Sequence, residues 1–229
     1  MVPPSLTPDP DHGPHPWVLV DHAMAGSAAN HQGGGAAEIL LVALDEPGAQ
    51  AKIAALVARG RRVGATGGTA DDRSAAVGAG ATLLLIDPDV DGDDAAVAAV
   101  AAGCSGVTVV LAGADRATAT AAARVAVDGG VDPAHVVVEL TSDELGTGDP
   151  TGHLPVGARV GVRLLPPAGL SGEALDGWEI GAVMGALARQ PATIRGVTLQ
   201  RVRRVDVVLA ALAHGRLPAC TPAPGIGAA

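Results

Sequence analysis

Arg195 is the charged residue of this chain whose position most needs a chemical explanation. It lies inside a short apolar run, Thr193–Val197, where a guanidinium must reach a polar cavity or find a carboxylate. The planar fork of a guanidinium suits phosphate and other anions. Two interpretations stay open: Arg195 binds an anion, or it forms a salt bridge to Glu139 or Asp21.

Glu139 marks a second position with chemical potential. A turn leads into a run of valines, and this run ends in the acidic and hydroxyl residues Glu139, Thr141, Ser142 and Asp143. Short apolar runs bounded by turn residues are typical of buried parallel strands. Polar residues at the carboxyl end of such a strand lie where ligands bind, so the sequence predicts a ligand-binding position here.

Eight short apolar runs recur along the chain, most of them separated by helical patterns. They are Trp17–Val20, Ile39–Leu44, Arg62–Ala65, Thr82–Ile86, Val107–Leu111, His135–Leu140, Arg159–Leu165 and Thr193–Val197. Strand–helix alternation with buried strands indicates a parallel sheet. Eight repeats in about 200 residues favour a TIM-type (β/α)8 barrel. An open doubly wound sheet is the alternative, because periodicity alone does not show closure.

Start and stop signals delimit the helices between these runs. The expected helices are Pro47–Arg59, one capped by Thr69 with Asp72, Asp94–Ala102, one capped by Asp115, Ser171–Arg189 and a last one from Thr198. In the last helix, Leu199, Val202, Val205, Leu209 and Leu212 form a buried stripe, whereas Arg201 and Arg204 face water.

One connection departs from this scheme. Asp21–Glu38 is short and contains Gly33-Gly34-Gly35, so we expect the barrel to lack its first covering helix. The outward side chains of the first two strands would then face water. Exposed apolar patches usually mark interfaces. We therefore expect an oligomer whose contact lies beside these strands, with the proline-rich tail folded back over them as the alternative.

Composition sets the broad class. The chain has 229 residues, 48 % hydrophobic and 17 % charged, with a net charge of −9 and 1 % aromatic residues. These values exclude nucleic acids and anionic membrane surfaces as partners. No apolar run approaches the roughly 20 residues that span a bilayer. We expect a single barrel domain over residues 17–216, with disordered tails at 1–16 and 217–229. Because the first tail has no signal-peptide pattern, we expect a cytoplasmic protein.

Several motifs are more simply explained as structure than as sites. The glycines of Gly64–Gly68 do not have phosphate-loop spacing, and no two of the seven histidines lie four residues apart in a helical ligand pattern. Cys104 and Cys220 read as reduced thiols, and Cys104 as a small core residue. The acidic loop Asp87–Asp94 lacks the closing Glu of a calcium loop, so it reads as a solvated helical first turn.

Four segments occur in an order that is typical of one family of TIM barrels. They are AAVGAGATLLLID, GVTVVLAG, GGVDPAHVVVELT and IRGVTLQRVRRVDVVLAAL. In this order they resemble the dihydropteroate synthases, the pterin-binding TIM barrels of folate synthesis, over most of Trp17–Ala213. The first is similar to the family's A-x-x-x-G-A-x-x-I-N-D, the second to its fifth strand, the third to G-V-x-x-x-x-I-x-x-D-P-G, and the last to its closing strand and helix.

The chain departs from the family pattern at most catalytic positions. Asp21 stands at the Asn of the first strand, Ala65-Thr66 at the Asp-Thr of the third, and Leu85-Ile86 at the Asn-Asp of the fourth, unless Asp87 takes that place. Glu139-Leu140-Thr141 replaces Asp-Pro-Gly, Arg163-Leu164-Leu165 replaces Ser-Arg-Lys, and the closing Arg-x-His keeps Arg195 but has Val197 for His.

The resemblance therefore implies a barrel without the parent transferase activity. We expect an accessory or regulatory subunit of a homo- or hetero-oligomer, with an intact paralogue as one candidate partner. The alternative is an enzyme or binder of a pterin or another anionic small molecule. The candidate ligand-binding residues are Asp21, Thr66, Asp87, Glu139, Arg163 and Arg195. We expect no catalytic residue of the parent reaction, no resident metal and no cofactor; magnesium would be needed only if pyrophosphate binding survives.

Overall fold

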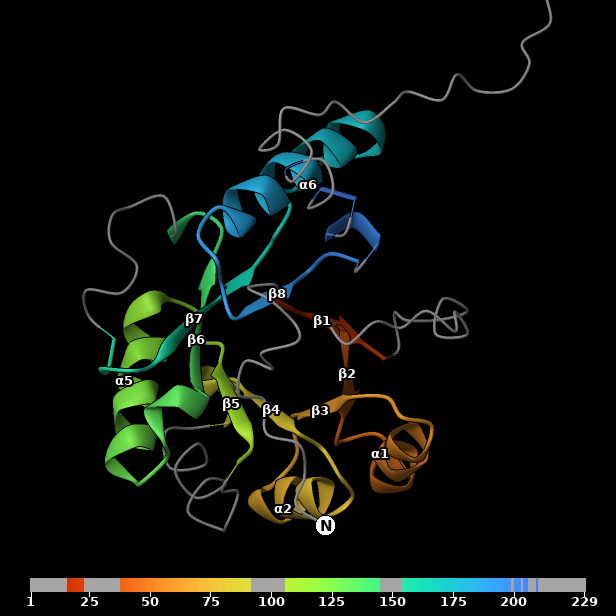
Figure 1. Ribbon diagram of the computed structural model, residues 1–229, viewed down its shortest axis with the longest axis vertical. Coiled ribbons are helices and arrows are strands. Elements are labelled where there is room, and N and C mark those ends of the chain that lie inside the picture. Colours follow the sequence, from red (N-terminus) through yellow and green to blue (C-terminus); the bar gives the residue numbers. More distant parts are fainter. Residues whose placement is uncertain are drawn as a thin grey trace, which may run out of the picture.

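Eight parallel strands close into a barrel (Figure 1). The computed structural model describes residues 16–22, 38–91, 106–144, 154–198, 200–202, 204–205 and 209. Each strand pairs with its neighbours along the chain, and β8 returns to β1. The strands are β1 Trp17–Asp21, β2 Glu38–Ala43, β3 Val63–Thr66, β4 Leu83–Ile86, β5 Thr108–Leu111, β6 Val136–Thr141, β7 Arg159–Arg163 and β8 Thr193–Arg195. The predicted TIM-type barrel is confirmed, and the open-sheet alternative is wrong.

Helices follow most of the described strands. They are α1 Ala49–Ala58, α2 Ala70–Gly78, α3 Pro88–Asp91, α5 Arg116–Asp128 and α6 Gly172–Leu187, with the 3-10 turn η2 Pro133–His135 before β6. Thr69 and Asp72 form the predicted reciprocal cap of α2, and the Asp115 side chain caps α5 by accepting from the Thr118 N–H. The helix expected over Asp94–Ala102 lies outside the described residues.

Side chains alternate between two apolar cores. Outward-facing residues such as Val18, Val42, Leu84 and Val138 pack under the helices. Inward-facing residues fill the barrel, and they are Leu19, Ile39, Leu41, Leu83, Leu85, Val110, Ala112, Val137 and Ala192. Because the chain has no Phe or Tyr, these small aliphatic side chains must pack closely. Gly161 illustrates the closeness: an added Cβ would lie 2.2 Å from Thr193 Oγ1.

The flank beside β1 and β2 corrects one expectation. The outward side chains of Val18, Leu40, Val42 and Leu44 are buried, and that of Val20 is partly buried. The prediction that these residues face water is therefore wrong. The predicted absence of a covering helix concerns residues 23–37, which lie outside the described residues.

The last strands end earlier than the apolar pattern suggests. Strand β8 stops at Arg195 because Gly196 has φ = 91° and passes close to the Leu164 carbonyl. The described residues 200–202, 204–205 and 209 are helical, with Val202 and Val205 buried as predicted. Arg204 is exposed, but Arg201 forms ion pairs with Asp176 and Glu179 of α6 instead of facing water alone.

The two ends of the chain determine whether the predicted domain boundaries can be checked. The two tails predicted at 1–16 and 217–229 lie outside the described residues apart from Pro16, so the domain limits stay predictions. In the part of the chain that the structure describes, no helix is long and apolar enough to cross a membrane.

Candidate functional site

The six candidate residues gather at one end of the barrel, here called the mouth, where the strands have their carboxyl ends. Asp21 and Thr66 are the last residues of β1 and β3, Asp87 follows β4, and Arg163 and Arg195 end β7 and β8. Glu139 lies in β6, on the same face as the inward-pointing Val137. Parallel closure therefore brings together side chains separated by up to 174 positions in the sequence, from Asp21 to Arg195.

A buried ion pair spans the strands of the mouth. Arg195 Nε donates to Glu139 Oε2 at 2.9 Å, and Arg195 Nη2 donates to Glu139 Oε1 at 2.5 Å. The Glu139 side chain is 1 % exposed, whereas that of Arg195 is 19 % exposed. Of the two interpretations of Arg195, the salt bridge to Glu139 is the contact that the structure shows.

The carboxylates around Arg195 favour its charged form. Burial alone would lower the pKa of its guanidinium. Hydrogen bonds and charge from Glu139, with smaller contributions from Asp21 and Asp87, outweigh that effect and raise this pKa above its ordinary value. Asp21 and Asp87 therefore act on Arg195 through space even though Glu139 takes its hydrogen bonds.

Arg163 is the second cation of the mouth and is less firmly held. In the barrel register it lies beside Arg195, and its Nε is 3.8 Å from Glu139 Oε1. That distance is an ion pair without a hydrogen bond, and within the described residues the buried Nε has no hydrogen-bond partner. Its side chain is 22 % exposed. One carboxylate thus serves two guanidinium groups, and Arg163 keeps donors for a further acceptor.

Thr141, predicted as part of the polar end of β6, is already satisfied. Its N–H and Oγ1 both lie against Glu144 Oε2, at 2.8 and 3.0 Å. The other carboxylate oxygen of Glu144 accepts from the Arg116 N–H at the start of α5. Glu144 therefore ties the end of β6 to the neighbouring helix and takes up the hydrogen bonds of Thr141.

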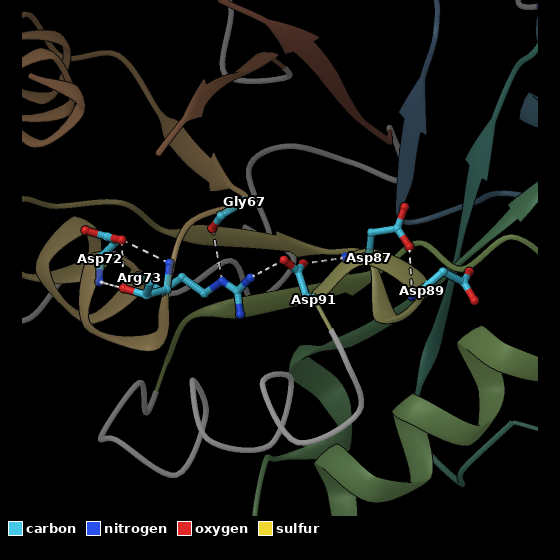
Figure 2. A network of polar contacts seen from close by, with 7 residues as sticks. Gly67, Asp72, Arg73, Asp87, Asp89 and Asp91 are labelled. Carbon is cyan, nitrogen blue, oxygen red and sulfur yellow. Dashed lines mark hydrogen bonds and ion pairs between the residues drawn. The ribbon is translucent and has the colours of Figure 1, made fainter. Parts of the chain in front are cut away.

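Asp87 reaches the mouth through an anchored turn that the sequence reasoning missed (Figure 2). Arg73 is 1 % exposed. Its Nε donates to the Gly67 carbonyl at 3.1 Å, and its Nη2 lies 2.6 Å from Asp91 Oδ1. Asp91 Oδ2 in turn accepts from the Asp87 N–H at 3.0 Å. Arg73 therefore positions the β4–α3 turn that carries Asp87.

This turn corrects the reading of the acidic loop. Asp91 was expected to be solvated, but its side chain is 10 % exposed because it pairs with Arg73. The available signal was positional: Arg73 lies three and four residues before Ala76 and Val77, on the face of α2 that packs against the core. A charge on that stripe requires a buried partner.

The described residues of the mouth do not form a cluster of metal ligands. Among the described residues, no three His, Cys, Asp or Glu side chains come together to hold a metal ion. Glu139 and Asp91 are already paired with arginines.

Comparison with known proteins gives a consistent result for the fold. No protein-family model and no curated protein sequence matches the chain. Among solved structures, a Yersinia pestis dihydropteroate synthase with a pterine–sulfa conjugate is 12 % identical, with a TM-score of 0.68, covering 88 % of this chain and 95 % of that one. The Xanthomonas albilineans enzyme in complex with 7,8-dihydropteroate is 17 % identical, with a TM-score of 0.61, covering 87 % and 93 %.

A third example extends the same likeness. The Burkholderia cenocepacia dihydropteroate synthase is 15 % identical, with a TM-score of 0.64, and the match covers 88 % of this chain and 92 % of that one. Identities this low establish the fold and leave the chemistry to be argued from the residues. The chain therefore has the barrel fold of the dihydropteroate synthases, as its sequence resemblance predicted.

Proposed function

We propose that the chain is a dihydropteroate-synthase-like barrel that has lost the parent reaction and acts as an accessory or regulatory subunit in a protein complex. The observation that carries this proposal is the bidentate Arg195–Glu139 pair at the mouth. A carboxylate that binds ring N–H groups needs accessible acceptor sites, whereas both oxygens of Glu139 already accept from Arg195 and the Glu139 side chain is 1 % exposed.

The residues around this pair support the same conclusion. The family resemblance implies that carboxylates and Asn read the pterin ring nitrogens, but Leu85 is an inward-facing aliphatic residue at one such position. Leu165, at the position of the family's Lys, is 49 % exposed and brings no charge. Each ring donor left unpaired in a buried site costs about 1–3 kcal/mol, which weakens pterin binding before any chemistry begins.

The direct test is an activity assay with the purified chain. Given a dihydropterin pyrophosphate, p-aminobenzoate and magnesium, we expect no dihydropteroate to form. An authentic dihydropteroate synthase assayed in parallel provides the reference rate. Turnover within about a hundredfold of that rate, some 2.7 kcal/mol in activation free energy, would overturn the proposed loss of activity.

A complex should be detectable from the native host. Affinity capture of the full chain is expected to recover a stoichiometric partner, with an intact dihydropteroate synthase paralogue as the first candidate. Capture should be repeated with the chain heat-unfolded, which removes the folded surface but keeps the sequence. Recovery of nothing specific to the folded chain would argue against the accessory role.

The second candidate function is binding of a small anion at the mouth, and Arg163 is the observation that favours it. Its guanidinium forms an ion pair with Glu139 without a hydrogen bond, and it is partly exposed. An anion could therefore bind between Arg163 and Arg195, with Asp21, Thr66 and Asp87 around the site. A thermal-shift screen with pterins, pyrophosphate and sugar phosphates tests this. A ligand at a hundredfold excess over its Kd adds about 2.7 kcal/mol to stability. If none of these ligands raises the melting temperature, anion binding is contradicted and the accessory role remains the proposed function.

A further inference from the structure

The inward side chains at the amino ends of the strands form a layer, here called the floor, at the end of the barrel opposite the mouth. Each layer of such a barrel takes four side chains from alternate strands. In the floor these are Trp17 of β1, Arg62 directly before β3, Thr108 of β5 and Arg159 of β7. Branched aliphatic residues usually fill such layers, so the two arginines require an explanation.

The surroundings of two glycines show that both floor arginines point inward. A Cβ added to Gly161, two residues after Arg159, would lie 2.9 Å from Val137 of the inner core. A Cβ added to Gly64, two residues after Arg62, would lie 2.9 Å from two leucines of the same core. Side chains two positions apart in an extended strand share a face, so Arg159 and Arg62 face the interior.

A contact between Arg62 and Trp17 confirms that they share the floor. The Arg62 guanidinium carbon lies 4.2 Å from the centre of the Trp17 ring, although β2 separates their strands. This cation–π contact fixes the position of the positive charge. The four floor residues include no carboxylate, and Glu38, at the start of β2, is already bound by Arg61. The floor therefore has two positive charges and no acidic residue within its layer.

Arg159 is the floor arginine that lacks a counter-charge. It is partly buried, and within the part of the chain that the structure describes its side chain forms no ion pair or hydrogen bond. Burial lowers the pKa of its guanidinium, and no carboxylate opposes that effect. By contrast, Glu139 helps to raise the pKa of Arg195 at the mouth. A partly buried charge without a partner is costly, so this position favours binding of an anion.

A buried hydroxyl group next to the floor also lacks a partner. Thr193 is 1 % exposed, and among the described residues its Oγ1 has no hydrogen-bond partner. A Cβ added to Gly161 would lie 2.2 Å from this oxygen, so the hydroxyl lies over Gly161, the next inward residue of β7 after Arg159. Buried polar atoms without a partner are rare and indicate an additional acceptor or donor. Thr193 therefore offers a second polar group on the same side of the barrel as Arg159.

We propose that the floor of the barrel binds a phosphate group, as inorganic phosphate or as part of a small molecule, between Arg159 and Arg62. The planar fork of Arg159 donates to two phosphate oxygens, a geometry that suits this group. Arg62, held on the Trp17 ring, adds positive charge from the other side, and the Thr193 hydroxyl is a third donor. Because catalysis in such barrels takes place at the mouth, the floor site would stabilise or regulate the protein. The proposal does not depend on the proposed function.

The fluorescence of Trp17 provides a local test of phosphate binding. The chain has two tryptophans, so Trp178→Phe leaves Trp17 as the single reporter. Inorganic phosphate, added at constant ionic strength, should change this fluorescence saturably with a Kd below about 1 mM. Sodium chloride at the same ionic strength should give no saturable change. Glucose 6-phosphate distinguishes the two sources, because a site that encloses the anion alone binds inorganic phosphate more tightly. No saturable response to either phosphate would overturn the proposal.

Substitutions in the same background then locate the site. Arg159→Met should weaken phosphate binding about tenfold or more. Because it removes an unpaired charge, it should not lower the melting temperature measured without phosphate. Arg59→Met, at the exposed end of α1, is the matched control and should keep the full response. A response that survives Arg159→Met, or one that is lost in Arg163→Met instead, would overturn the proposal. A lower melting temperature of Arg159→Met without phosphate would also contradict it, since Arg159 would then have a structural partner.

Discussion

Two arginine–carboxylate pairs lie near the same end of this barrel, and their arginines differ in how far they are exposed to solvent. Arg73 joins the loops after β3 and β4, with side chains 2 % and 10 % exposed for Arg73 and Asp91. Arg195 and Glu139 join two barrel strands, and the arginine is 19 % exposed. The first pair also holds backbone groups, through Gly67 and Asp87. The second has Arg163 beside it, at 3.8 Å.

This difference indicates that the Arg73–Asp91 pair is structural, whereas the Arg195–Glu139 pair can also bind a ligand. Removing Arg73 leaves Asp91 without the only basic side chain that is paired with it among the described residues. Breaking the Arg195–Glu139 pair leaves Glu139 with Arg163 as a second partner. Stability should therefore depend mainly on the first pair, and ligand response mainly on the second.

The largest effect is expected from Arg73→Leu. The substitution leaves Asp91 buried without its cation and frees the Gly67 carbonyl, so the free energy of unfolding should fall by about 3–5 kcal/mol. Urea unfolding followed by circular dichroism measures this. The double variant Arg73→Leu with Asp91→Leu removes both charges and should recover part of the loss. A loss below about 1 kcal/mol for the single variant would show that the anchored turn is not a structural element.

Arg195→Leu should have a smaller effect, about 1–3 kcal/mol, because Glu139 loses two hydrogen bonds but can move toward Arg163. The same unfolding experiment applies. Combining Arg195→Leu with Arg163→Met removes both cations and should cost more than the sum of the two single changes. Strict additivity would mean that Arg163 does not replace Arg195 as the partner of Glu139.

Arg163→Met alone should change the free energy of unfolding by no more than about 0.5 kcal/mol, since its Nε makes no hydrogen bond that the change would break. It should, however, abolish any thermal shift produced by an anion at the mouth. Arg204→Met, at an exposed position in the last helix, is the matched control and should keep that shift. An anion response unchanged in Arg163→Met would place the anion elsewhere.

The smallest expected effect is a pH dependence of local stability, and it should differ between α2, which carries Arg73, and β6, which carries Glu139. Hydrogen bonds from the Thr69 side chain and backbone lower the pKa of Asp72 from 3.8, so the folded state favours its ionised form. The stabilisation is therefore complete above pH 3.8 and is lost as the pH falls through the lowered pKa. Hydrogen exchange should show the first turn of α2 opening under acid before strand β6 does. Asp72→Asn should reduce this pH dependence, and equal opening of both regions would contradict it.

Local sequence determined most of the fold. The eight apolar runs became the eight strands, and the reciprocal cap at Thr69 and the cap at Asp115 formed as predicted. Such features depend on residues within a few positions of each other, so periodicity and capping patterns detect them. Parallel closure then places the carboxyl ends of all strands together, which is why six candidate residues chosen from separate segments converge at one mouth.

Only the tertiary structure decided which charges pair. Sequence left Arg195 between an anion, Glu139 and Asp21, because the choice depends on the register of β6, β7 and β8 across the closed barrel. The role of Arg73 was also missed, since its acidic partner Asp91 lies in α3, beyond the next strand. The outward residues of β1 and β2 were expected to face water, but Val18, Leu40 and Val42 are buried. Burial and cross-strand pairing are set by distant segments. A periodic pattern can therefore predict that a buried charge needs a partner, whereas only the closed barrel determines which residue that partner is.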